Sequence, residues 1–287
     1  MRDRAFGVEI ECGYEREEYR DCDCECTCYT CDFCESGCQE SLGPDEECNC
    51  NCECEECSLC QYGCEENHGS YGCEVATTLL ANNGFDDWLD DIHEDGSGVE
   101  IPSPILRGTE GLRQLRAVME LLRTNGFSTG SGDGLHVHHD APEFVDDDTL
   151  TARLIELWEE NLPVIDRFVS PLRRGGTYLM CDSYRSTYRA QQWASFKRSK
   201  SLGDLGLDKF RSLNVTPLRH YGTIEFRLHE GTLDFDQASA WIHFGQSMLE
   251  MAKRRRTIIT CAEPLDLLRA ARVSKRSTEQ LLAKAGA

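Results

Sequence analysis

The stretch Phe6-Gly-Val-Glu-Ile-Glu11 alternates apolar and acidic side chains with a period of two. Successive side chains of a β-strand point to opposite faces of a sheet, so Val8 and Ile10 would share one face and Glu9 and Glu11 the other. The stretch therefore predicts a strand whose apolar face packs against a core and whose acidic face is free to bind a ligand.

Two further segments repeat this pattern. Gly134-Leu-His-Val-His138 places its two histidines on one face, and Thr223-Ile-Glu-Phe-Arg-Leu228 places Glu225 and Arg227 together. One such strand is typical of an ordinary antiparallel sheet with a solvated face. Three such strands, two of them flanked by glycine, favour a binding site for cations and phosphate. Carboxylates and imidazoles ligate divalent cations, and guanidinium groups pair with phosphate.

The remaining sequence predicts helices that cover the other face of this sheet. Asp95-Gly-Ser-Gly-Val-Glu100 predicts a turn that leads into a strand, and Phe85–Leu89 predicts a short strand or turn. Apolar residues at helical spacing predict a helix that ends near Asn125, with Thr109 as its N-cap. Five more helices are expected over residues 148–169, 184–197, 236–255, 264–273 and 278–284. Antiparallel strands with helices on one face make an α+β fold.

The charge of the chain is concentrated in one segment. The net charge is -21, yet residues 21–106 contain 22 acidic residues and no Lys or Arg, while the remainder is nearly balanced. Such an acidic segment repels nucleic acids and anionic membranes, so neither is expected as a partner. The sequence shows neither a membrane-spanning apolar run nor a signal-peptide core, which predicts a cytoplasmic protein.

Fifteen of the 18 cysteines lie between residues 22 and 73, in an internal duplication. The spacing C-x-C-x-C-x-C-x2-C-x2-C-x3-C occurs twice, at an offset of 26 residues. We therefore expect an insert over residues 21–74, which interrupts a ligand-binding domain made of residues 1–20 and 75–287. The insert is expected to bind metal through Cys22, Cys24, Cys26, Cys28, Cys31, Cys34, Cys38, Cys48, Cys50, Cys52, Cys54, Cys57, Cys60, Cys64 and Cys73.

Cross-links must hold this insert together, because Leu42 and Leu59 are almost its only aliphatic residues. Zinc thiolates are the first expectation, since the expected compartment is reducing and C-x2-C pairs chelate zinc well. Iron–sulfur clusters come second, because C-x2-C-x2-C-x3-C is a ferredoxin spacing, although no proline follows the last cysteine. Disulfides come third, because they need an oxidising compartment.

The ordered motifs together resemble the amidoligase family, which is part of the glutamine synthetase-like carboxylate–amine ligases. The matching pieces are FGVEIE, DGSGVEIPSP, SGDGLHVHHD, RRGGTYLMC and SLNVTPLRHYGTIEFRLHEGTLD, and they span residues 6–234 without the cysteine insert. The resemblance implies a curved antiparallel sheet that binds ATP and divalent cations. It also implies that a carboxylate is activated by phosphorylation and that an amine then displaces the phosphate.

The resemblance also assigns roles to individual residues. Glu9, His136 and Glu225 would hold one Mg2+ or Mn2+ ion. Glu11 and Glu100 would hold another ion, and His138 would lie near the nucleotide. The remaining expected contacts, to phosphate or substrate, come from Arg227, from one of Arg173 and Arg174, and from Asn214.

Other histidines receive different interpretations. His139 points away from His136 and His138 and is expected to be a bystander. Simple alternation puts His229 on the Arg227 face, which leaves its role open. His93, His220 and His243 are read as structural residues.

Three functions fit the sequence. The first is an ATP-dependent ligase that joins a small-molecule, peptide or protein carboxylate to an amine and forms ADP. The second is a phosphotransferase on the same fold. The third is a non-catalytic metal-binding interaction protein, which the full set of acidic and histidine positions argues against.

Overall fold

The fold is seen in a computed structural model, which describes residues 4–14, 64–96, 98–130, 132–176, 190–205, 207 and 209–286. Its centre is a seven-stranded antiparallel sheet with the order β2-β3-β1-β5-β7-β6, and β4 pairs with the end of β1. The strands are β1 (Phe6–Tyr14), β2 (His93–Asp95), β3 (Gly98–Pro102), β4 (Phe127–Ser128), β5 (Gly134–Asp140), β6 (Leu213–Asn214) and β7 (Thr223–Glu230).

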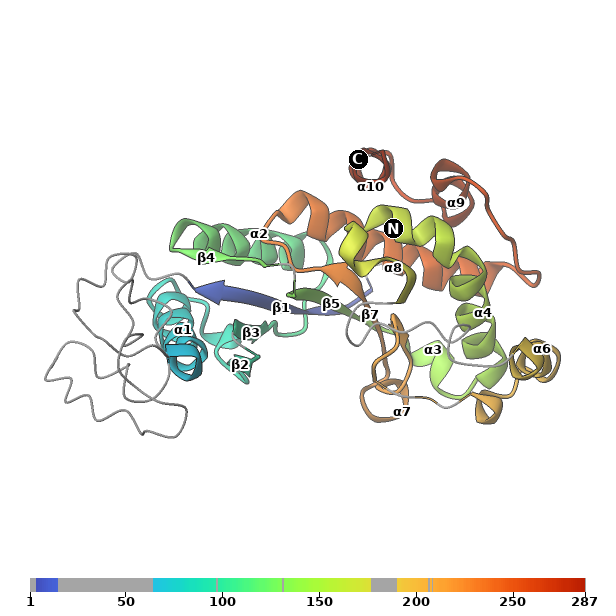
Figure 1. The fold of residues 1–287 in the computed structure, drawn as a ribbon, viewed down its shortest axis with the longest axis horizontal. Coiled ribbons are helices and arrows are strands. Elements are labelled where there is room, and N and C mark those ends of the chain that lie inside the picture. Colours follow the sequence, from blue (N-terminus) through green and yellow to red (C-terminus); the bar gives the residue numbers. More distant parts are fainter. Residues whose placement is uncertain are drawn as a thin grey trace, which may run out of the picture.

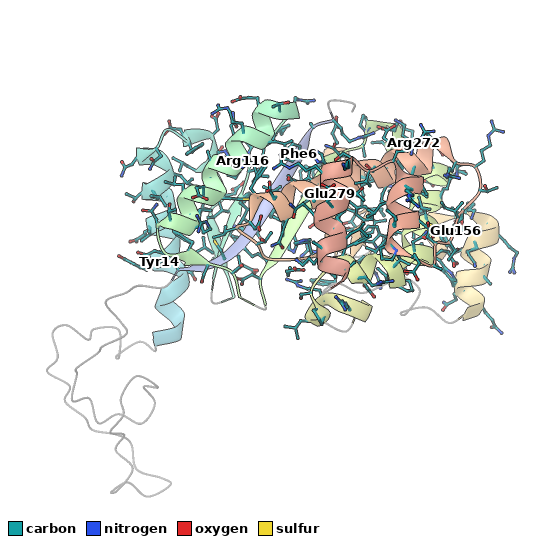
Figure 2. All side chains as sticks on the ribbon, turned by 90° about the horizontal axis from the view of Figure 1, so that it is seen from above. Phe6, Tyr14, Arg116, Glu156, Arg272 and Glu279 are labelled. Atoms are coloured by element: carbon teal, nitrogen blue, oxygen red, sulfur yellow. The ribbon has the colours of Figure 1, made fainter. Side chains whose placement is uncertain are left out.

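Helices cover one face of this sheet (Figure 1). The covering layer consists of α2 (Gly108–Thr124), α4 (Asp148–Ile165) and α8 (Phe235–Arg254), with α9 (Pro264–Ala271) and α10 (Lys275–Ala285) packed on α8. Seen from above, this layer lies over the strands (Figure 2). The arrangement confirms the expected α+β fold with antiparallel strands. Among the helices that the structure describes, none combines the length and apolar character needed to cross a bilayer.

The alternation in the first strand sets which face meets the core. Phe6, Val8, Ile10 and Cys12 of β1 are all buried, whereas the residues between them are partly exposed. The buried side chains join a core with the large aromatic residues of α4 and α8, which stabilises the sheet by removing apolar surface from water. The opposite face therefore retains the polar side chains of β1.

Close packing holds α8 against the middle of the sheet. A Cβ atom at Gly245 would lie only 2.5 Å from Nε2 of His139 on β5, so this position of the helix requires glycine. The helix starts at a cap in which Asp234 accepts hydrogen bonds from the amides of Asp236 and Gln237, at 2.8 and 3.2 Å. These contacts fix α8 directly behind β5 and β7.

The remaining elements complete the described chain. They are α1 (Cys64–Asn82), η3 (Asp86–Trp88), α3 (Pro142–Val145), η4 (Asp166–Phe168), η5 (Pro171–Gly176), α6 (Ala190–Ser199), η6 (Leu202–Asp204) and α7 (Leu218–Tyr221). Residues 86–88 form a single 3-10 turn that buries Trp88, which agrees with the turn and not with the strand among the two expectations for this stretch. The expected N-cap of α2 is wrong, because Arg107 takes that position without a side-chain hydrogen bond and Thr109 lies inside the helix.

Most of the predicted insert, residues 21–63, falls outside the described residues, which resume at Cys64. Helix α1 runs across the expected boundary between residues 74 and 75. Within it, Cys73 is partly buried and packs against the hydrophobic core. The zinc ligands and the alternative iron–sulfur clusters stay predictions.

Candidate metal centre

The polar face of the sheet gathers charged side chains from four strands. We call it the cation face, defined by Glu9 and Glu11 of β1, Glu100 of β3, His136 and His138 of β5, and Glu225 and Arg227 of β7. Cross-strand pairing aligns these residues, because Glu9 lies opposite His136, Glu11 opposite Glu100, and His138 opposite Glu225. Neighbouring strands thus bring together side chains that are more than 200 residues apart in the chain.

Two groups on this face have the geometry of cation sites. The ligand atoms of Glu9, His136 and Glu225 lie within 4.8 Å of one another, and so do those of Glu11, Glu100 and His136. In the first group, Nδ1 of His136 lies 3.1 Å from Glu9 and 3.8 Å from Glu225. In the second, Nε2 of His136 lies 3.3 Å from Glu11. Carboxylates with one imidazole are hard to borderline ligands that suit Mg2+ or Mn2+.

A glycine at the start of β5 makes room for both groups. A Cβ atom on Gly134 would lie 2.6 Å from Nε2 of His136 and 3.0 Å from a carboxylate oxygen of Glu11. The amide of Gly134 also donates a hydrogen bond to Glu11. Gly134 therefore leaves room for His136 and Glu11 to approach each other, and its amide orients Glu11.

Glu225 is buried and held from two sides. The amide nitrogen of Asn214 on β6 donates to its Oε2 at 2.7 Å, and Arg227 donates to its Oε1. Asn214 is itself oriented by Thr216, whose backbone N–H and hydroxyl both donate to Oδ1. Asn214 was expected to position substrate, and its observed contact is with Glu225. Neither this role of Asn214 nor the position of Thr216 follows from strand alternation.

Further partners lie at the edges of the cation face. Nε2 of His138 is 2.9 Å from Glu9, and its Nδ1 is 3.3 Å from the hydroxyl of Thr223. On the other edge, Nε2 of His93 lies 3.6 Å from Glu100. The sequence analysis read His93 as structural. Counting across the hairpin would have found it, because Asp95 pairs with Gly98 and this register places His93 opposite Glu100.

The acidic side chains titrate differently according to their partners. Burial, followed by the negative charge of Glu9, raises the pKa of Glu100 to about 7. Burial would also raise the pKa of Glu9, but hydrogen bonds with His136 and His138 outweigh it and hold that pKa well below its usual value. Burial lowers the pKa of His138, yet its hydrogen bond with Glu9 and the charge of Glu225 raise it overall. The charged forms of Glu9 and His138 thus stabilise each other.

Of the two neighbouring arginines, Arg173 approaches the cation face. Its guanidinium donates to the carbonyl of Gly132 at 3.1 Å and to that of Asp133. A Cβ atom on Gly134 would lie 3.2 Å from this guanidinium and 3.0 Å from a carboxylate oxygen of Glu11. Arg174 instead donates to the carbonyl of Val169 at 3.1 Å, a contact that holds the local turn.

The two remaining histidines of these strands face the core. His139 is fully buried and its ring lies 5.4 Å from that of Phe226, in agreement with the expected bystander role. The interpretation of His229 as a neighbour of Arg227 is wrong, because its ring lies 5.2 Å from that of Trp241 and its Nδ1 donates to the carbonyl of Glu230. A register shift between Leu135 and Val137 causes this, since it interrupts the alternation of β7.

A comparison with protein families identifies a match to this chain. Residues 61–249, about two thirds of the chain, match the sequence profile of the family described as "Putative amidoligase enzyme". None of the curated proteins searched matches the chain.

Solved structures show only distant similarity. One is described as "GmaS/ADP complex-Conformation 1" and has a TM-score of 0.41 at 11% identity, covering 99% of this chain and 67% of its own. Another, a "novel glutamine synthase homolog", has a TM-score of 0.45 at 12% identity, covering 98% of this chain and 65% of its own. The chain thus spans about two thirds of the length of these proteins. On the family match, which covers β3, β5, β7 and their cation-face residues, the chain belongs to the amidoligase family.

Proposed function

We propose that the protein is an ATP-dependent ligase that joins a carboxylate to an amine, in an amide or isopeptide bond, through an acyl phosphate. The observation that carries the proposal is the pair of carboxylate–imidazole groups that share His136 on one face of the sheet. Two cation sites side by side suit the transfer of a phosphoryl group better than a single structural metal does.

The chemistry explains why such a face is needed. A carboxylate and an amine do not condense at neutral pH, because the carboxylate is anionic and hydroxide is a poor leaving group. Attack of the carboxylate on the γ-phosphorus of ATP forms an acyl phosphate and releases ADP. Attack of the amine then releases inorganic phosphate and a proton, and leaves the amide.

The cation face contributes positive charge and orientation to both steps. When bound, Mg2+ or Mn2+ would neutralise the phosphate oxygens and align them for transfer. Glu9, His136 and Glu225 would hold one ion, and Glu11, Glu100 and His136 the other. Arg227 is partly exposed beside Glu225, so its guanidinium can also reach an anionic group of a substrate.

An adjoining pocket supports binding of the nucleoside part of ATP. A cavity of about 400 Å3 is lined by both Glu9 and His138 and extends along the strands past Gly7 to Tyr221 and Ile105. The side chains of Tyr221 and Ile105 are large and 80% and 77% exposed, so they offer apolar surface to a nucleobase. A base between them would place its phosphates at Glu9 and His138.

At the other end of the cation face, the guanidinium of Arg173 lies beside Gly134, whose amide donates to Glu11. Because a guanidinium pairs with a carboxylate in a two-pronged geometry, we assign it to the carboxylate substrate or to the acyl phosphate. The two substrates would then approach the phosphoryl group from opposite ends of the same face.

Replacement of one cation ligand tests this function. Glu225→Gln keeps the volume of the side chain but removes its charge, so ATP turnover should fall by at least ~100-fold while the fold is retained. Glu279→Gln, an exposed change on α10, is the matched control and should keep full turnover. The wild-type products should be ADP, phosphate and an amide. Release of AMP would contradict the acyl phosphate, and a phosphorylated acceptor would indicate a phosphotransferase.

A further inference from the structure

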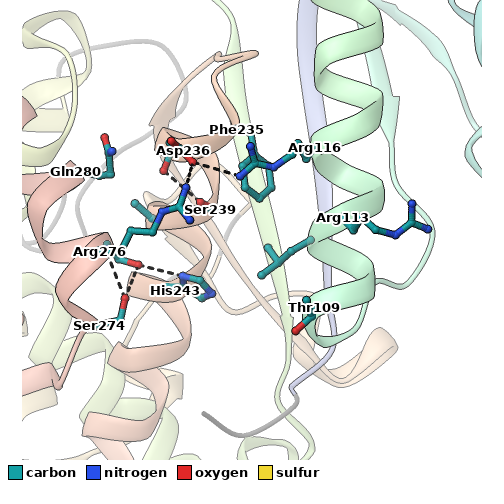
Figure 3. A pocket seen from close by; sticks show the side chains of 13 residues that line it. Thr109, Arg113, Arg116, Phe235, Asp236, Ser239, His243, Ser274, Arg276 and Gln280 are labelled. Atoms are coloured by element: carbon teal, nitrogen blue, oxygen red, sulfur yellow. Dashed lines mark hydrogen bonds and ion pairs between the residues drawn. The ribbon is translucent and has the colours of Figure 1, made fainter.

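A second pocket lies in the helical layer, and Figure 3 shows it from close by. Its volume is about 280 Å3, and the N-terminal turns of α2, α8 and α10 form its walls. This volume is just below the range of roughly 300–1,000 Å3 that is usual for sites of drug-sized ligands. It has room for a small organic molecule.

Positive charge dominates the walls of this pocket, although the protein as a whole carries a net charge of -21. Its lining includes Arg113, Arg116 and Arg276 but a single acidic residue, Asp236. One carboxylate oxygen of Asp236 lies 2.7 Å from Arg276 and 3.5 Å from Arg116. A single carboxylate thus serves two guanidinium groups, which leaves a net positive charge between them.

The third arginine is engaged elsewhere. Arg113 pairs with Glu110 on the same helix at 2.6 Å, and its guanidinium extends away from Asp236 (Figure 3). Arg113 therefore provides a natural comparison for the other two, because it has the same charge and a similar exposure on the rim of the same pocket.

The floor of the pocket is apolar. Leu112 and Ala240 contribute to it, and the guanidinium of Arg116 lies over the ring of Phe235 at 4.1 Å from the ring centre. This stacking holds the arginine in place and leaves apolar surface next to its charge. A ligand that fills the pocket would meet charge at one end and hydrocarbon at the other.

A chain of hydrogen bonds joins α10 to α8 beside this apolar floor. The hydroxyl of Ser274 donates to that of Ser277 at 2.9 Å, which leaves the proton of Ser277 for Nδ1 of His243 at 3.0 Å. Burial, followed by the charge of Arg276, lowers the pKa of His243, which favours the neutral ring at this contact. The first turns of α8 and α10 add the partial positive charge of their helix ends.

We propose that this pocket binds a small organic anion, a carboxylate or phosphate monoester with an apolar body, between Arg116 and Arg276. The anionic group pairs with the two guanidinium groups that share Asp236. The apolar body lies against Leu112 and Phe235. Neither the sequence motifs nor the cation face involves these residues, so the proposal is independent of the ligase function.

Binding of phenyl phosphate and benzoate to the full chain, measured by isothermal titration calorimetry, tests the proposal. Both should bind the wild type, and benzyl alcohol, which has the same ring without a charge, should bind at least ~10-fold more weakly. Arg276→Ala and Arg116→Ala should each weaken binding of the two anions by ~10-fold or more, because each removes one of two charge-assisted contacts. Arg113→Ala should change binding by less than ~2-fold.

Several outcomes would overturn the proposal. If Arg276→Ala and Arg116→Ala bind both anions as the wild type does, the anions bind elsewhere. Equal binding of benzyl alcohol would show that the pocket does not select anions, and no binding of either anion to the wild type would exclude the site. Arg276 is exposed, so its replacement should leave thermal unfolding unchanged, and Arg276→Lys should recover part of the affinity.

Discussion

The side-chain amide of Asn214 donates a hydrogen bond of 2.7 Å to Oε2 of Glu225, and both residues are buried. Asn214→Leu would keep most of the volume but leave this oxygen without its donor. Because groups that orient a metal ligand typically change affinity by ~10–100-fold, we expect Mn2+ binding to weaken by at least ~10-fold. Titration with Mn2+, followed by electron paramagnetic resonance, measures this change.

Asn125→Leu provides the control, because the amide of Asn125 bonds to the end of α2 far from the cation face. It should leave Mn2+ affinity unchanged. An Asn214→Leu protein with wild-type Mn2+ affinity and wild-type turnover would show that Arg227 alone orients Glu225.

Features of this site that are set within one strand can be predicted from the sequence, whereas features that are set by the pairing of strands cannot. Side-chain alternation is a property of a single strand, so it paired Glu9 with Glu11, His136 with His138, and Glu225 with Arg227 without knowledge of the neighbouring strands. The register between strands is not local. The shift beside Leu135, which turns His229 into the core, depends on how β5 and β7 pair, and no motif in either strand marks it.

Most residues that contact the cation face could not be predicted from the sequence either. Asn214 holds Glu225 from the short strand β6, which is too brief to show alternation, and Thr216 beyond the end of that strand holds Asn214. The choice between Arg173 and Arg174 depends on the path of the turn that carries them. By contrast, the position of His93 beside Glu100 could have been found, because a short hairpin fixes which residues face each other.

Gly134 is a position where a single methyl group should impair the site. In Gly134→Ala the added carbon would lie 2.6 Å from Nε2 of His136, so the buried ring must move. A displacement of about 1 Å at a reacting centre can cost ~100-fold in rate, and we expect turnover to fall by about that factor. Steady-state ATPase assays with the carboxylate and amine substrates would measure it.

Gly13→Ala is the matched control for this change. Gly13 lies on β1, and an added carbon there has no neighbour within 4 Å. It should keep turnover within ~2-fold, since nothing has to move. If Gly134→Ala were equally active, the close approach of Gly134 to His136 would have no functional role.

Tyr221 should contribute to affinity for the nucleoside rather than to the chemical step. The ring is 80% exposed at the edge of the pocket next to Glu9 and His138, so Tyr221→Ala should not alter folding. Loss of stacking on a base, worth ~1–3 kcal/mol, should raise the KM for ATP by ~10-fold or more with kcat within ~2-fold. Tyr221→Phe, which keeps the ring, should behave as the wild type.

Inorganic triphosphate separates the two parts of ATP in this test. It has no base, so its inhibition constant should be the same for wild type and Tyr221→Ala. An equal loss for triphosphate would show that the change disturbs the cation face. An unchanged KM for ATP would place the base outside this pocket.

An ion network ties the start of β1 to the helical layer and should make stability depend on acid. Glu143 on α3 accepts hydrogen bonds from Arg4 at 2.6 Å and from Lys253 at 2.6 Å. Burial would raise the pKa of Glu143, but these bonds outweigh it and lower the pKa to about 2. Because the folded pKa lies below the unfolded one, the charged form stabilises the fold above pH ~4.5, and this contribution is lost as pH falls toward ~2.

Glu143→Gln should therefore lower the free energy of unfolding by about 1 kcal/mol near pH 7, a value that allows for solvent screening of a partly exposed pair. The difference from wild type should shrink steadily as pH falls from about 5 toward about 2, because the unfolded carboxylate becomes neutral in this range while the folded one stays charged. Urea unfolding at about pH 7, 5 and 3.5 measures it, and Glu279→Gln, whose partner Lys275 is 3.8 Å away on the surface, should show no difference at any pH. A Glu143→Gln deficit that stays constant from pH 7 to 3.5 would mean that the loss comes from packing and not from the charge of Glu143.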